Sequence, residues 1–375
     1  MLRPCPGLTP GTRVRLPALP QNFSCDMHPE AHAIVADNDA WTATVLLPDR
    51  PKDVPRIREV LGSHLVCMGF PDGARERVLD ICNMGDLGFV LDDDLAALTH
   101  AQQRSPEQAR TAVKRYGQAL LETLTGEPPA DAPFPARAVR GLFHRIRSRV
   151  SEPFFDYLLE GFAAWLGPGQ VEELTPLDPH DTDPLGSYLK RRHQCAGCVS
   201  YERYAQYILG IESLTDIVRS DMVRAYHEAT NACWVLPNDL LSFRKECFHD
   251  DHNNAICVLR RTKGLTLQEA VDEAAARLGA AQLQVLNLEA KIMASPLAGD
   301  DLQTYLRTLQ AIAAANQRWS YMTPRYHGEN FRWTGALTGT FVLHPDHTRF
   351  PPIPAGARLP ATRHAAGDHR RVGAS

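Results

Sequence analysis

The feature that most constrains the fold is the recurrence of apolar residues at steps of three and four along most of the chain from about residue 55. This period places apolar side chains on one face of an α-helix. It predicts a helix over 204–229, with a stripe formed by Ile208, Ile211, Leu214, Ile217, Val218 and Met222. It also predicts a long helix over 265–294, with Thr266 as N-cap, and another over 300–322. Alternating strand patterns are scarce, so we expect an all-α bundle.

Breaks in the helical pattern suggest the domain organisation. Proline- and glycine-rich segments at 126–138 and 167–184 are expected to be loops between helices. The C-terminal segment has few large apolar residues, a composition typical of disorder. We therefore expect an irregular N-terminal segment over 1–25, one α-helical domain over 26–345 and a disordered tail over 346–375.

The composition narrows the classes of partner. The chain has 40 Lys and Arg against 44 Asp and Glu, a formal net charge of −4. Nucleic-acid-binding domains usually carry a clear basic excess, so we expect no nucleic-acid partner. No run of about 18 apolar residues is present, so we expect no membrane span. The N-terminal residues also lack the apolar core of a secretory signal.

The nine cysteines are irregularly spaced and odd in number. Such a pattern favours reduced thiols in a cytoplasmic protein over a disulfide framework. Cys195 and Cys198 form a C-x-x-C pair, but a zinc or redox site would need matching ligands that the sequence does not offer. We interpret this pair as two small, partly buried helix residues.

Three consecutive aspartates, Asp92, Asp93 and Asp94, lie among apolar residues of a helical segment. Adjacent carboxylates repel one another, which is costly unless water or a cation compensates. A metal site is one interpretation. The other is a solvated cluster at a helix start, where the helix dipole favours negative charge.

A second polar cluster lies in the segment WVLPNDLLSFRKE. Asn238, Ser242 and Glu246 are spaced at i, i+4 and i+8, so each is offset by about 40° from the previous one around a helix. They present an amide, a hydroxyl and a carboxylate on one face, and these oxygen ligands suit a hard cation such as Mg²⁺. Pro237 marks a point where a helical segment can restart, and Lys245 adds a cation. A polar stripe on a surface helix is the alternative, which the neighbouring apolar residues disfavour.

The segment from Asn238 to Glu246 resembles the N-D-x-x-S-x-x-K-E second metal motif of class I terpene synthases, the bacterial type especially. The LDDD sequence at 91–94 is similar to the aspartate-rich motif of that family. Arg325-Tyr326 resembles its C-terminal arginine–tyrosine pair, and Arg192 resembles its pyrophosphate-sensing arginine. These motifs occur in the order of the family and span residues 89 to 326, most of the chain.

The resemblance implies a single helical bundle of the class I terpenoid synthase type, enclosing an apolar active-site cavity. It implies metal ligands at Asp92, Asp93, Asn238, Ser242 and Glu246. Diphosphate would be bound by Arg192, Lys245, Arg325 and Tyr326, through the donors that suit phosphate oxygens. It further implies that Cys195 and Ala196 form the short link and backbone turn that pass diphosphate binding on to the cation.

Aromatic side chains complete the expected site. An allylic cation needs a dry, apolar pocket, and aromatic faces stabilise such a charge by cation–π contact. Phe89, just before the aspartates, and Trp319, shortly before Arg325, are the candidates. Ordinary core packing is the alternative for each of them.

The resemblance predicts a terpene synthase that ionises and cyclises a prenyl diphosphate and releases diphosphate. The expected substrate is farnesyl diphosphate, giving a sesquiterpene, and the expected cofactor is Mg²⁺, with three ions when substrate is bound, or Mn²⁺. A homodimer is also compatible with the family. Geranyl or geranylgeranyl diphosphate are the alternative substrates.

One position departs from the family pattern. The aspartate-rich motif usually closes with an acid where this chain has Ala96. Asp94 cannot replace that acid, because it lies about 200° around the helix from Asp92. A non-catalytic relative that binds prenyl diphosphates therefore remains an alternative. A chain-elongating prenyltransferase is disfavoured because the second motif is N-D-L-L-S and not a second aspartate-rich motif.

Overall fold

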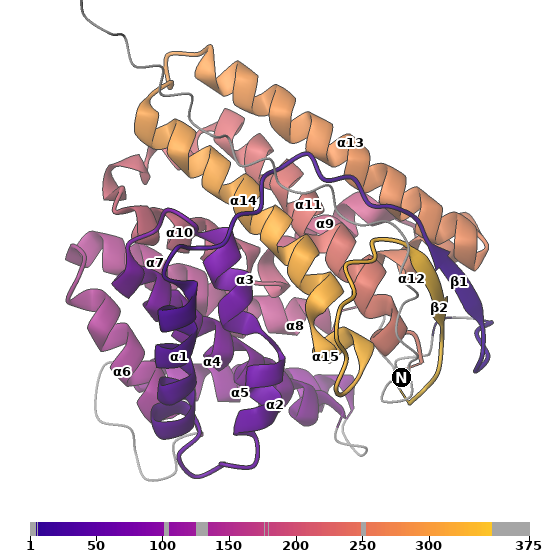
Figure 1. The fold of residues 1–375 in the computed structure, drawn as a ribbon, viewed down its shortest axis with the longest axis horizontal. Helices are drawn as coiled ribbons and strands as arrows, with labels where there is room; N and C mark the ends of the chain where they lie inside the picture. Colours follow the sequence, from indigo (N-terminus) through magenta and orange to yellow (C-terminus); the bar gives the residue numbers. More distant parts are fainter. Residues whose placement is uncertain are drawn as a thin grey trace, which may run out of the picture.

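Fifteen α-helices and a two-stranded sheet make up the described part of the fold (Figure 1). The computed structural model describes residues 5, 7–100, 105–124, 134–175, 177–178, 180–248 and 253–346. The helices are α1 (Ala31–Trp41), α2 (Val54–Glu59), α3 (Gly62–Gly69), α4 (Arg75–His100), α5 (Pro106–Glu122), α6 (Ala136–Arg147), α7 (Glu152–Ala164), α8 (Gln170–Glu173), α9 (Pro184–Cys195), α10 (Cys198–Leu209), α11 (Asp221–Glu246), α12 (Ala255–Lys263), α13 (Leu267–Met293), α14 (Asp300–Met322) and α15 (Pro324–His327). Two π-helical turns, η1 (Thr42–Leu46) and η2 (Trp165–Gly169), and two 3₁₀ turns, η3 (Glu212–Leu214) and η4 (Ile217–Arg219), lie between them.

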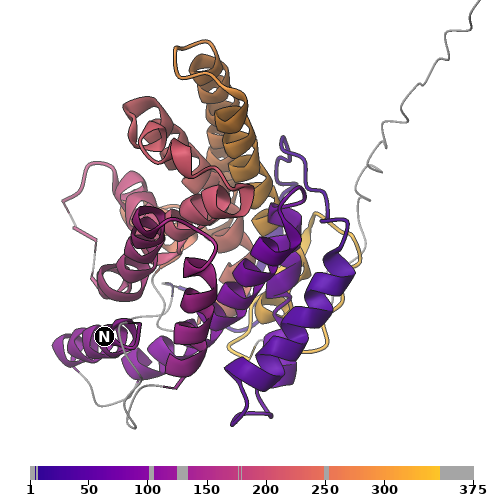
Figure 2. The same ribbon diagram turned by 90° about the vertical axis from the view of Figure 1, so that its left-hand side faces the viewer.

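Helix α11 is the central element of the bundle. It contacts α9, α12, α13, α14 and α15, and most of its side chains are buried. The N-terminal helices form a second group, in which α4 packs against α1, α3, α5 and α6. Helix α14 joins the two groups because it packs against both α3 and α11. Figure 2 shows α1 on the side of the bundle opposite the magenta and pink helices from the middle of the chain.

The two long helices predicted near the C-terminus are confirmed. Helix α13 begins after Thr266, whose side chain accepts a hydrogen bond from the Glu269 backbone while the Glu269 side chain bonds back to the cap. This reciprocal capping box satisfies two backbone donors at the helix start. Helix α14 spans Asp300–Met322, as the periodicity predicts.

The single helix predicted over 204–229 is wrong. Helix α10 ends at Leu209, its C-cap Gly210 adopts φ of +73°, and two 3₁₀ turns separate it from α11. Ser220 is extended immediately before α11 begins. The apolar steps of three and four persist across the break because Leu214 and Val218, on the 3₁₀ turns, still pack into the core.

The segment 1–25, predicted to be irregular, contains a strand. Strand β1 (Arg13–Leu16) pairs antiparallel with β2 (Gly339–Val342), with Arg13 opposite Val342 and Leu16 opposite Gly339 (Figure 1). The all-α prediction therefore omits one small sheet. A strand of four residues is too short to give a clear alternating pattern, and its partner lies at the other end of the chain.

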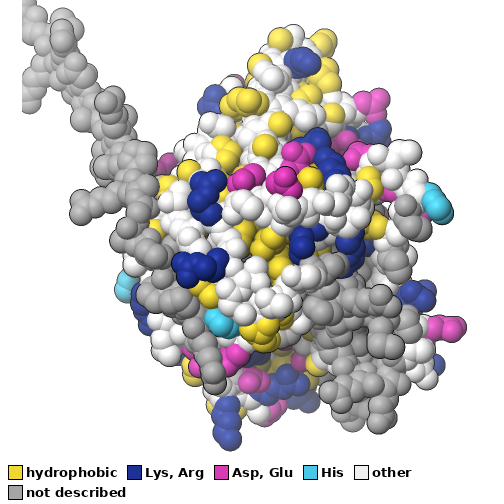
Figure 3. Space-filling model, turned by 90° about the vertical axis from the view of Figure 1, so that its right-hand side faces the viewer, with side chains coloured by type: hydrophobic (Ala, Val, Ile, Leu, Met, Phe, Trp, Pro, Cys, Tyr) yellow, Lys and Arg dark blue, Asp and Glu magenta, His cyan; other side chains and the backbone are white. Residues whose placement is uncertain are grey.

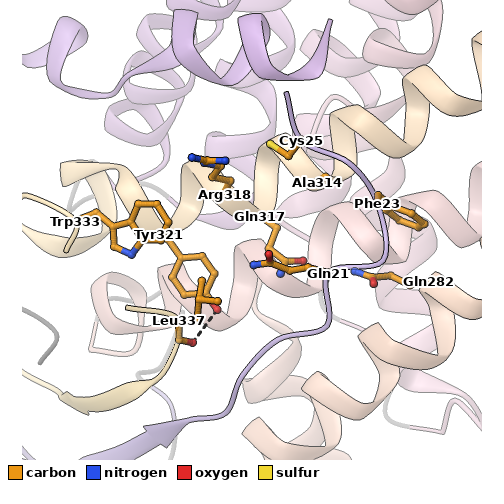
Figure 4. Close-up of a pocket in the computed structure, with 10 residues that line it drawn as sticks. All are labelled: Gln21, Phe23, Cys25, Gln282, Ala314, Gln317, Arg318, Tyr321, Trp333 and Leu337. Atoms are coloured by element: carbon orange, nitrogen blue, oxygen red, sulfur yellow. Dashed lines mark hydrogen bonds between the residues drawn. The ribbon is translucent and has the colours of Figure 1, made fainter. Parts of the chain in front are cut away.

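The residues that follow β1 are extended but held against the bundle. The Pro20 carbonyl accepts hydrogen bonds from the amides of Gln282 and Gln317, each at 3.1 Å. Figure 4 shows this segment lying across α14 beside a small cavity of about 40 Å³. Buried amide–carbonyl bonds of this kind replace the regular pairing that an extended segment lacks.

The predicted loops are only partly loops. Pro168 lies inside the π-helical turn η2, and helical structure continues through α8 to Glu173. Helix α6 begins at Ala136, inside the segment predicted as a loop, while 125–133 lie outside the described residues. The predicted tail also lies outside them from residue 347 onward.

The surface carries no dominant charge on the face shown in Figure 3, where both signs are interspersed with apolar side chains over the described residues. Within the described part of the chain, no helix is long and apolar enough to cross a membrane.

Candidate active site

A cavity of about 760 Å³ lies within the bundle and is bordered by α3, α4, α5, α7, α8, α9, α10, α11, α14 and α15. One part of its wall is charged and the rest is largely aromatic and aliphatic. All the predicted site residues except Ser242 border this cavity: Phe89, Asp92, Asp93, Arg192, Cys195, Ala196, Asn238, Lys245, Glu246, Trp319, Arg325 and Tyr326. Residues that are more than two hundred positions apart in the sequence therefore meet around one space.

The aspartates on α4 face Arg325. Its guanidinium donates to Asp92 Oδ2 at 2.6 Å and to Asp93 Oδ1 at 3.2 Å, and Asp93 also accepts from Arg56. Burial alone would raise the pKa of Asp93, but the charges of Arg325 and Arg56 outweigh it and hold that pKa below its usual value. Asp93 is therefore ionised throughout the neutral range, as a metal ligand must be.

Asp94 faces away from Arg325. Its carboxylate accepts hydrogen bonds from the Tyr116 hydroxyl at 3.0 Å and from Arg50 at 3.4 Å. This arrangement agrees with the helical geometry expected from the sequence. Ala96 borders the cavity, so no acid occupies the position where the family motif usually closes.

The second motif lies on α11, which runs unbroken through Pro237. The expectation that a helix restarts at this proline is wrong. Pro237 cannot donate a backbone hydrogen bond to the preceding turn. The missing donor would bond the Cys233 carbonyl, whereas Asn316 on α14 donates to the next carbonyl along the helix, that of Trp234, at 2.8 Å. Asn238 nevertheless lies on the same continuous helix as Glu246.

The polar groups of α11 are linked to neighbouring elements. Asn238 donates to the Tyr326 hydroxyl at 2.8 Å, and Glu246 accepts from Asn254, the N-cap of α12, at 3.1 Å. The positive charge of Arg325, together with burial, lowers the pKa of Lys245. The cationic groups at this end of the cavity are therefore crowded together, as expected where an anion binds.

The donors of the two motifs fit a divalent cation. Ser242 is fully buried, and its Oγ has no hydrogen-bond partner among the described residues. Buried hydroxyls normally have partners, so this orphan oxygen points to a ligand. The carboxylate, amide and hydroxyl oxygens are those that Mg²⁺ prefers. No three His, Cys, Asp or Glu side chains of the described residues cluster around one point. The possible metal ligands lie on two helices instead, the aspartates on α4 and the second motif on α11.

A helix break lies beside the charged end of the cavity. Helix α9 ends at Cys195, Ala196 follows, and Gly197 at φ of +77° precedes α10. The Cys195 carbonyl accepts hydrogen bonds from Trp165 at 3.1 Å and from Gln170 at 3.4 Å. Burial raises the pKa of the Cys195 thiol to about 12, so the thiol is neutral and unreactive. All nine cysteines are free, including Cys198.

The two predicted aromatic residues stack on each other. The ring centroids of Phe89 and Trp319 are 5.7 Å apart, and the Trp319 indole donates to the Val60 carbonyl at 2.7 Å. The guanidinium of Arg325 lies over the Phe89 ring at 5.3 Å. Further aromatic side chains that the sequence did not single out also border the cavity: Phe162, Trp165, Tyr201, Tyr204 and Trp234.

Two polar cavity residues were also missed. Glu173 at the end of α8 pairs with Arg192, with Arg192 Nη1 and Glu173 Oε1 3.5 Å apart. Asn253 links α8 to α9, because it donates to the Glu173 carbonyl and accepts from Arg191. Both residues lie in segments without a helical pattern, so the sequence carried no signal for them. Asp239, within the second motif, has a supporting role, because its carboxylate accepts from the Tyr188 hydroxyl at 2.6 Å and the Ala255 amide at 2.8 Å.

The fold and the site define a class of protein: helical enzymes that hold a metal-binding wall and an apolar cavity within one bundle. The family model described as "Terpene synthase family 2, C-terminal metal binding" matches residues 84–281, slightly more than half of the chain. The chain belongs to the terpene synthase family, whose members are lyases acting on prenyl diphosphates.

Individual relatives agree with this assignment. The chain is 26% identical to (3S,6E)-nerolidol synthase of Selaginella moellendorffii over 96% of both chains. It is also 26% identical to (E)-2-epi-beta-caryophyllene synthase of the same organism, over 90% of this chain and 92% of the other. The fold is similar to that of a cucumene synthase variant, with a TM-score of 0.68 and 18% identity over 81% of this chain and 99% of the other.

Proposed function

We propose that this terpene synthase acts on farnesyl diphosphate with Mg²⁺ as cofactor and releases a sesquiterpene. The observation that carries the proposal is the two-part cavity, with oxygen and guanidinium groups at one end and aromatic side chains over the remainder. The C15 substrate is supported by the synthases named above and by a cavity of about 760 Å³, within the usual range of ligand pockets.

The charged end would bind the diphosphate. Arg192, Lys245, Arg325 and Tyr326 all border the cavity there and provide donors for phosphate oxygens. Asp92, Asp93, Asn238, Ser242 and Glu246 would hold the divalent cations, with three ions and Mg²⁺ preferred over Mn²⁺. Bound cations would supply positive charge that stabilises the diphosphate as it leaves.

The chemistry begins when the bond between the allylic carbon and the diphosphate oxygen breaks, with the electron pair leaving on oxygen. The cation that remains lies among Phe89, Trp319 and the other aromatic side chains, whose faces stabilise positive charge. The apolar wall excludes water, which would otherwise end the reaction early. The turn at Cys195 and Ala196, next to Arg192, would align the substrate with the bound diphosphate.

The test is incubation of the purified protein with Mg²⁺ and, separately, the C10, C15 and C20 prenyl diphosphates, followed by gas chromatography–mass spectrometry. We expect a C15 hydrocarbon or alcohol, together with release of diphosphate. Absence of product from every substrate would contradict the proposal. Preference for another chain length would correct the substrate and leave the reaction class standing.

The missing acid at Ala96 favours one alternative, a relative that binds prenyl diphosphate without converting it. Tight Mg²⁺-dependent binding of farnesyl diphosphate without diphosphate release would support that alternative. A cytoplasmic location and a homodimer remain predictions, to be checked by fractionation and by light scattering.

A further inference from the structure

Glu173 introduces a negative charge at the place proposed to receive an anion. Its Oε1 lies 3.5 Å from Arg192 Nη1, and the two side chains are 25% and 14% exposed. Both residues border the cavity. A carboxylate beside a diphosphate site opposes binding by charge repulsion, so its placement there requires an explanation.

The position of Glu173 is well defined by its surroundings. Asn253 donates to the Glu173 backbone carbonyl at 3.0 Å and accepts from Arg191 at 2.7 Å. Arg191 also donates to the Thr175 carbonyl at 2.7 Å. These bonds tie the end of α8 to the last turn of α9, so the Glu173 side chain is held beside Arg192.

The Arg192 guanidinium has hydrogen-bond donors that are not fully used within the described residues. Its Nε is buried without a hydrogen-bond partner among the described residues. Its contacts are the 3.5 Å ion pair with Glu173 and a 3.6 Å contact to the Cys195 thiol. Arg325, by comparison, donates one hydrogen bond to Asp92 and another to Asp93. Arg192 therefore retains donor capacity for a second anion.

We propose that Glu173 is a positioning residue that acts as the counter-ion of Arg192 in the resting enzyme and gives up that role when diphosphate binds. The inference rests on the proposed function, because it takes Arg192 as a diphosphate ligand. Binding then includes an exchange of anions on one guanidinium. Glu173 offsets the charge of the largely buried arginine in the resting enzyme, in addition to the Asp239 carboxylate, and weakens the hold on product diphosphate after the reaction.

The α8 segment makes this exchange relevant to catalysis. Gln170, at the start of α8, donates to the Cys195 carbonyl at the helix break. Glu173 lies at the other end of the same short helix. When Glu173 releases Arg192, the change therefore occurs on α8, the helix that also contacts the turn preceding α10.

The chain offers a matched control, because Glu172 is the adjacent residue of the same helix and is exposed. The two variants Glu173→Gln and Glu172→Gln make the same change in charge at neighbouring positions. Binding of inorganic pyrophosphate with Mg²⁺ would be measured by isothermal titration calorimetry. We expect Glu173→Gln to bind at least about fivefold more tightly than the unmodified protein, and Glu172→Gln to bind equally.

Kinetics provide a second readout. For Glu173→Gln we expect a lower KM for the prenyl diphosphate and stronger inhibition by pyrophosphate, with kcat unchanged or lower because product leaves more slowly. A purely structural role would weaken binding and lower the melting temperature, and would not tighten binding. In an Arg192→Ala background the effect of Glu173→Gln should disappear, since the two residues act through one contact.

The possible failures are distinguishable. If the unmodified protein does not bind pyrophosphate with Mg²⁺, the proposed function fails. If it binds and Glu173→Gln binds equally or more weakly, the counter-ion role is overturned. Glu173→Ala, which removes the carboxylate entirely, is the second variant and should also bind more tightly; unchanged or weaker binding would likewise overturn the role.

Discussion

Two buried serines show how the surroundings of a single residue separate a ligand from a packing group. Ser242 and Ser320 are both fully buried, and the Oγ of each has no partner within the described residues. Neither serine borders the cavity, but Ser242 lies on α11 between Asn238 and Glu246, which do, whereas Ser320 lies on α14. Only the first oxygen lies within a set of possible metal ligands.

We therefore predict that Ser242→Ala lowers turnover by about tenfold or more and raises the Mg²⁺ concentration needed for half-maximal activity. Removing a buried, unpaired hydroxyl should leave stability unchanged or increase it slightly. Steady-state assays across a Mg²⁺ series, with melting temperatures, would check both expectations. Ser320→Ala is the matched control and should retain activity; equal activity in the two variants would remove Ser242 from the ligand set.

At the scale of elements, the break between α9 and α10 has the clearest functional consequence. A partly buried ion pair spans it, with His193 of α9 and Glu202 of α10 separated by 2.5 Å. Burial lowers the pKa of His227, which also faces Glu202 from α11 at 3.5 Å. The break is therefore held on the side of the core as well as by Trp165 and Gln170.

The glycine at this break gives a prediction. Gly197 and Gly264 both have positive φ, +77° and +66°, and neither has an atom closer than 3.8 Å to an added Cβ. Alanine at either position should cost about 1 kcal/mol because of its left-handed backbone conformation. Only Gly197→Ala should change turnover or the product ratio, because Gly197 borders the cavity.

Product analysis by gas chromatography, with melting curves for both variants, would check this expectation. Gly264, the C-cap of α12, does not border the cavity and supplies the control for backbone strain. An identical product profile in both variants would show that the geometry of the break does not direct the reaction.

At the scale of the whole molecule, stability depends on polar groups buried between helices. Asp86 on α4 is 3% exposed and accepts hydrogen bonds from Asn38 at 2.8 Å and from Thr42 at 2.6 Å. Burial outweighs these bonds and raises the pKa of Asp86 to about 7. Folding therefore favours the protonated form of Asp86 relative to the unfolded chain.

This shift predicts a pH dependence of folding. A carboxyl group whose pKa is higher when folded stabilises the protein fully below its unfolded pKa, near 4, and that contribution is lost as pH rises through about 7. Asp86→Asn cannot ionise. When the pH is raised from 5 to 8, the free energy of unfolding of this variant should therefore rise by about 3 kcal/mol relative to that of the unmodified protein.

Melting temperatures of both proteins at pH 5 and pH 8 would test this dependence. The difference between variant and unmodified protein should move in favour of Asp86→Asn at the higher pH. Asp216→Asn, at a carboxylate whose side chain is 96% exposed, controls for the change in net charge. A difference that is independent of pH would contradict the assignment to Asp86.

Much of the fold was predictable because helices are encoded locally. The capping box at Thr266 and the apolar steps of α13 and α14 lie within short windows of sequence. The prediction of one helix over 204–229 is wrong because Gly210 caps a helix inside an apolar pattern that continues across 3₁₀ turns. Apolar periodicity found Leu214 and Val218 in the core but also included Met222, which is exposed, because it does not report how the backbone turns between them.

The candidate site was predictable to the extent that its residues form motifs. Asp92, Asp93, Asn238 and Glu246 could be selected from spacing, chemistry and resemblance to a family. Glu173 could not, because it lies in a segment without a pattern and its meaning depends on Arg192. Pro237 does not interrupt α11, and a window around the proline could not show this because the helix packs against α13 and α14, which lie far along the chain.

The sequence by itself determined the helical class of this protein, the family it belongs to and the residue types available for metal and diphosphate. Tertiary structure alone decided that Arg325 meets Asp92, a residue 233 positions away, that β1 pairs with β2, and that Glu173 faces Arg192 at the cavity. The physical reason is the difference in sequence separation between the residues that interact in the two cases. Helical periodicity and capping depend on residues within a few positions of one another, whereas contacts between charges depend on how the whole chain packs.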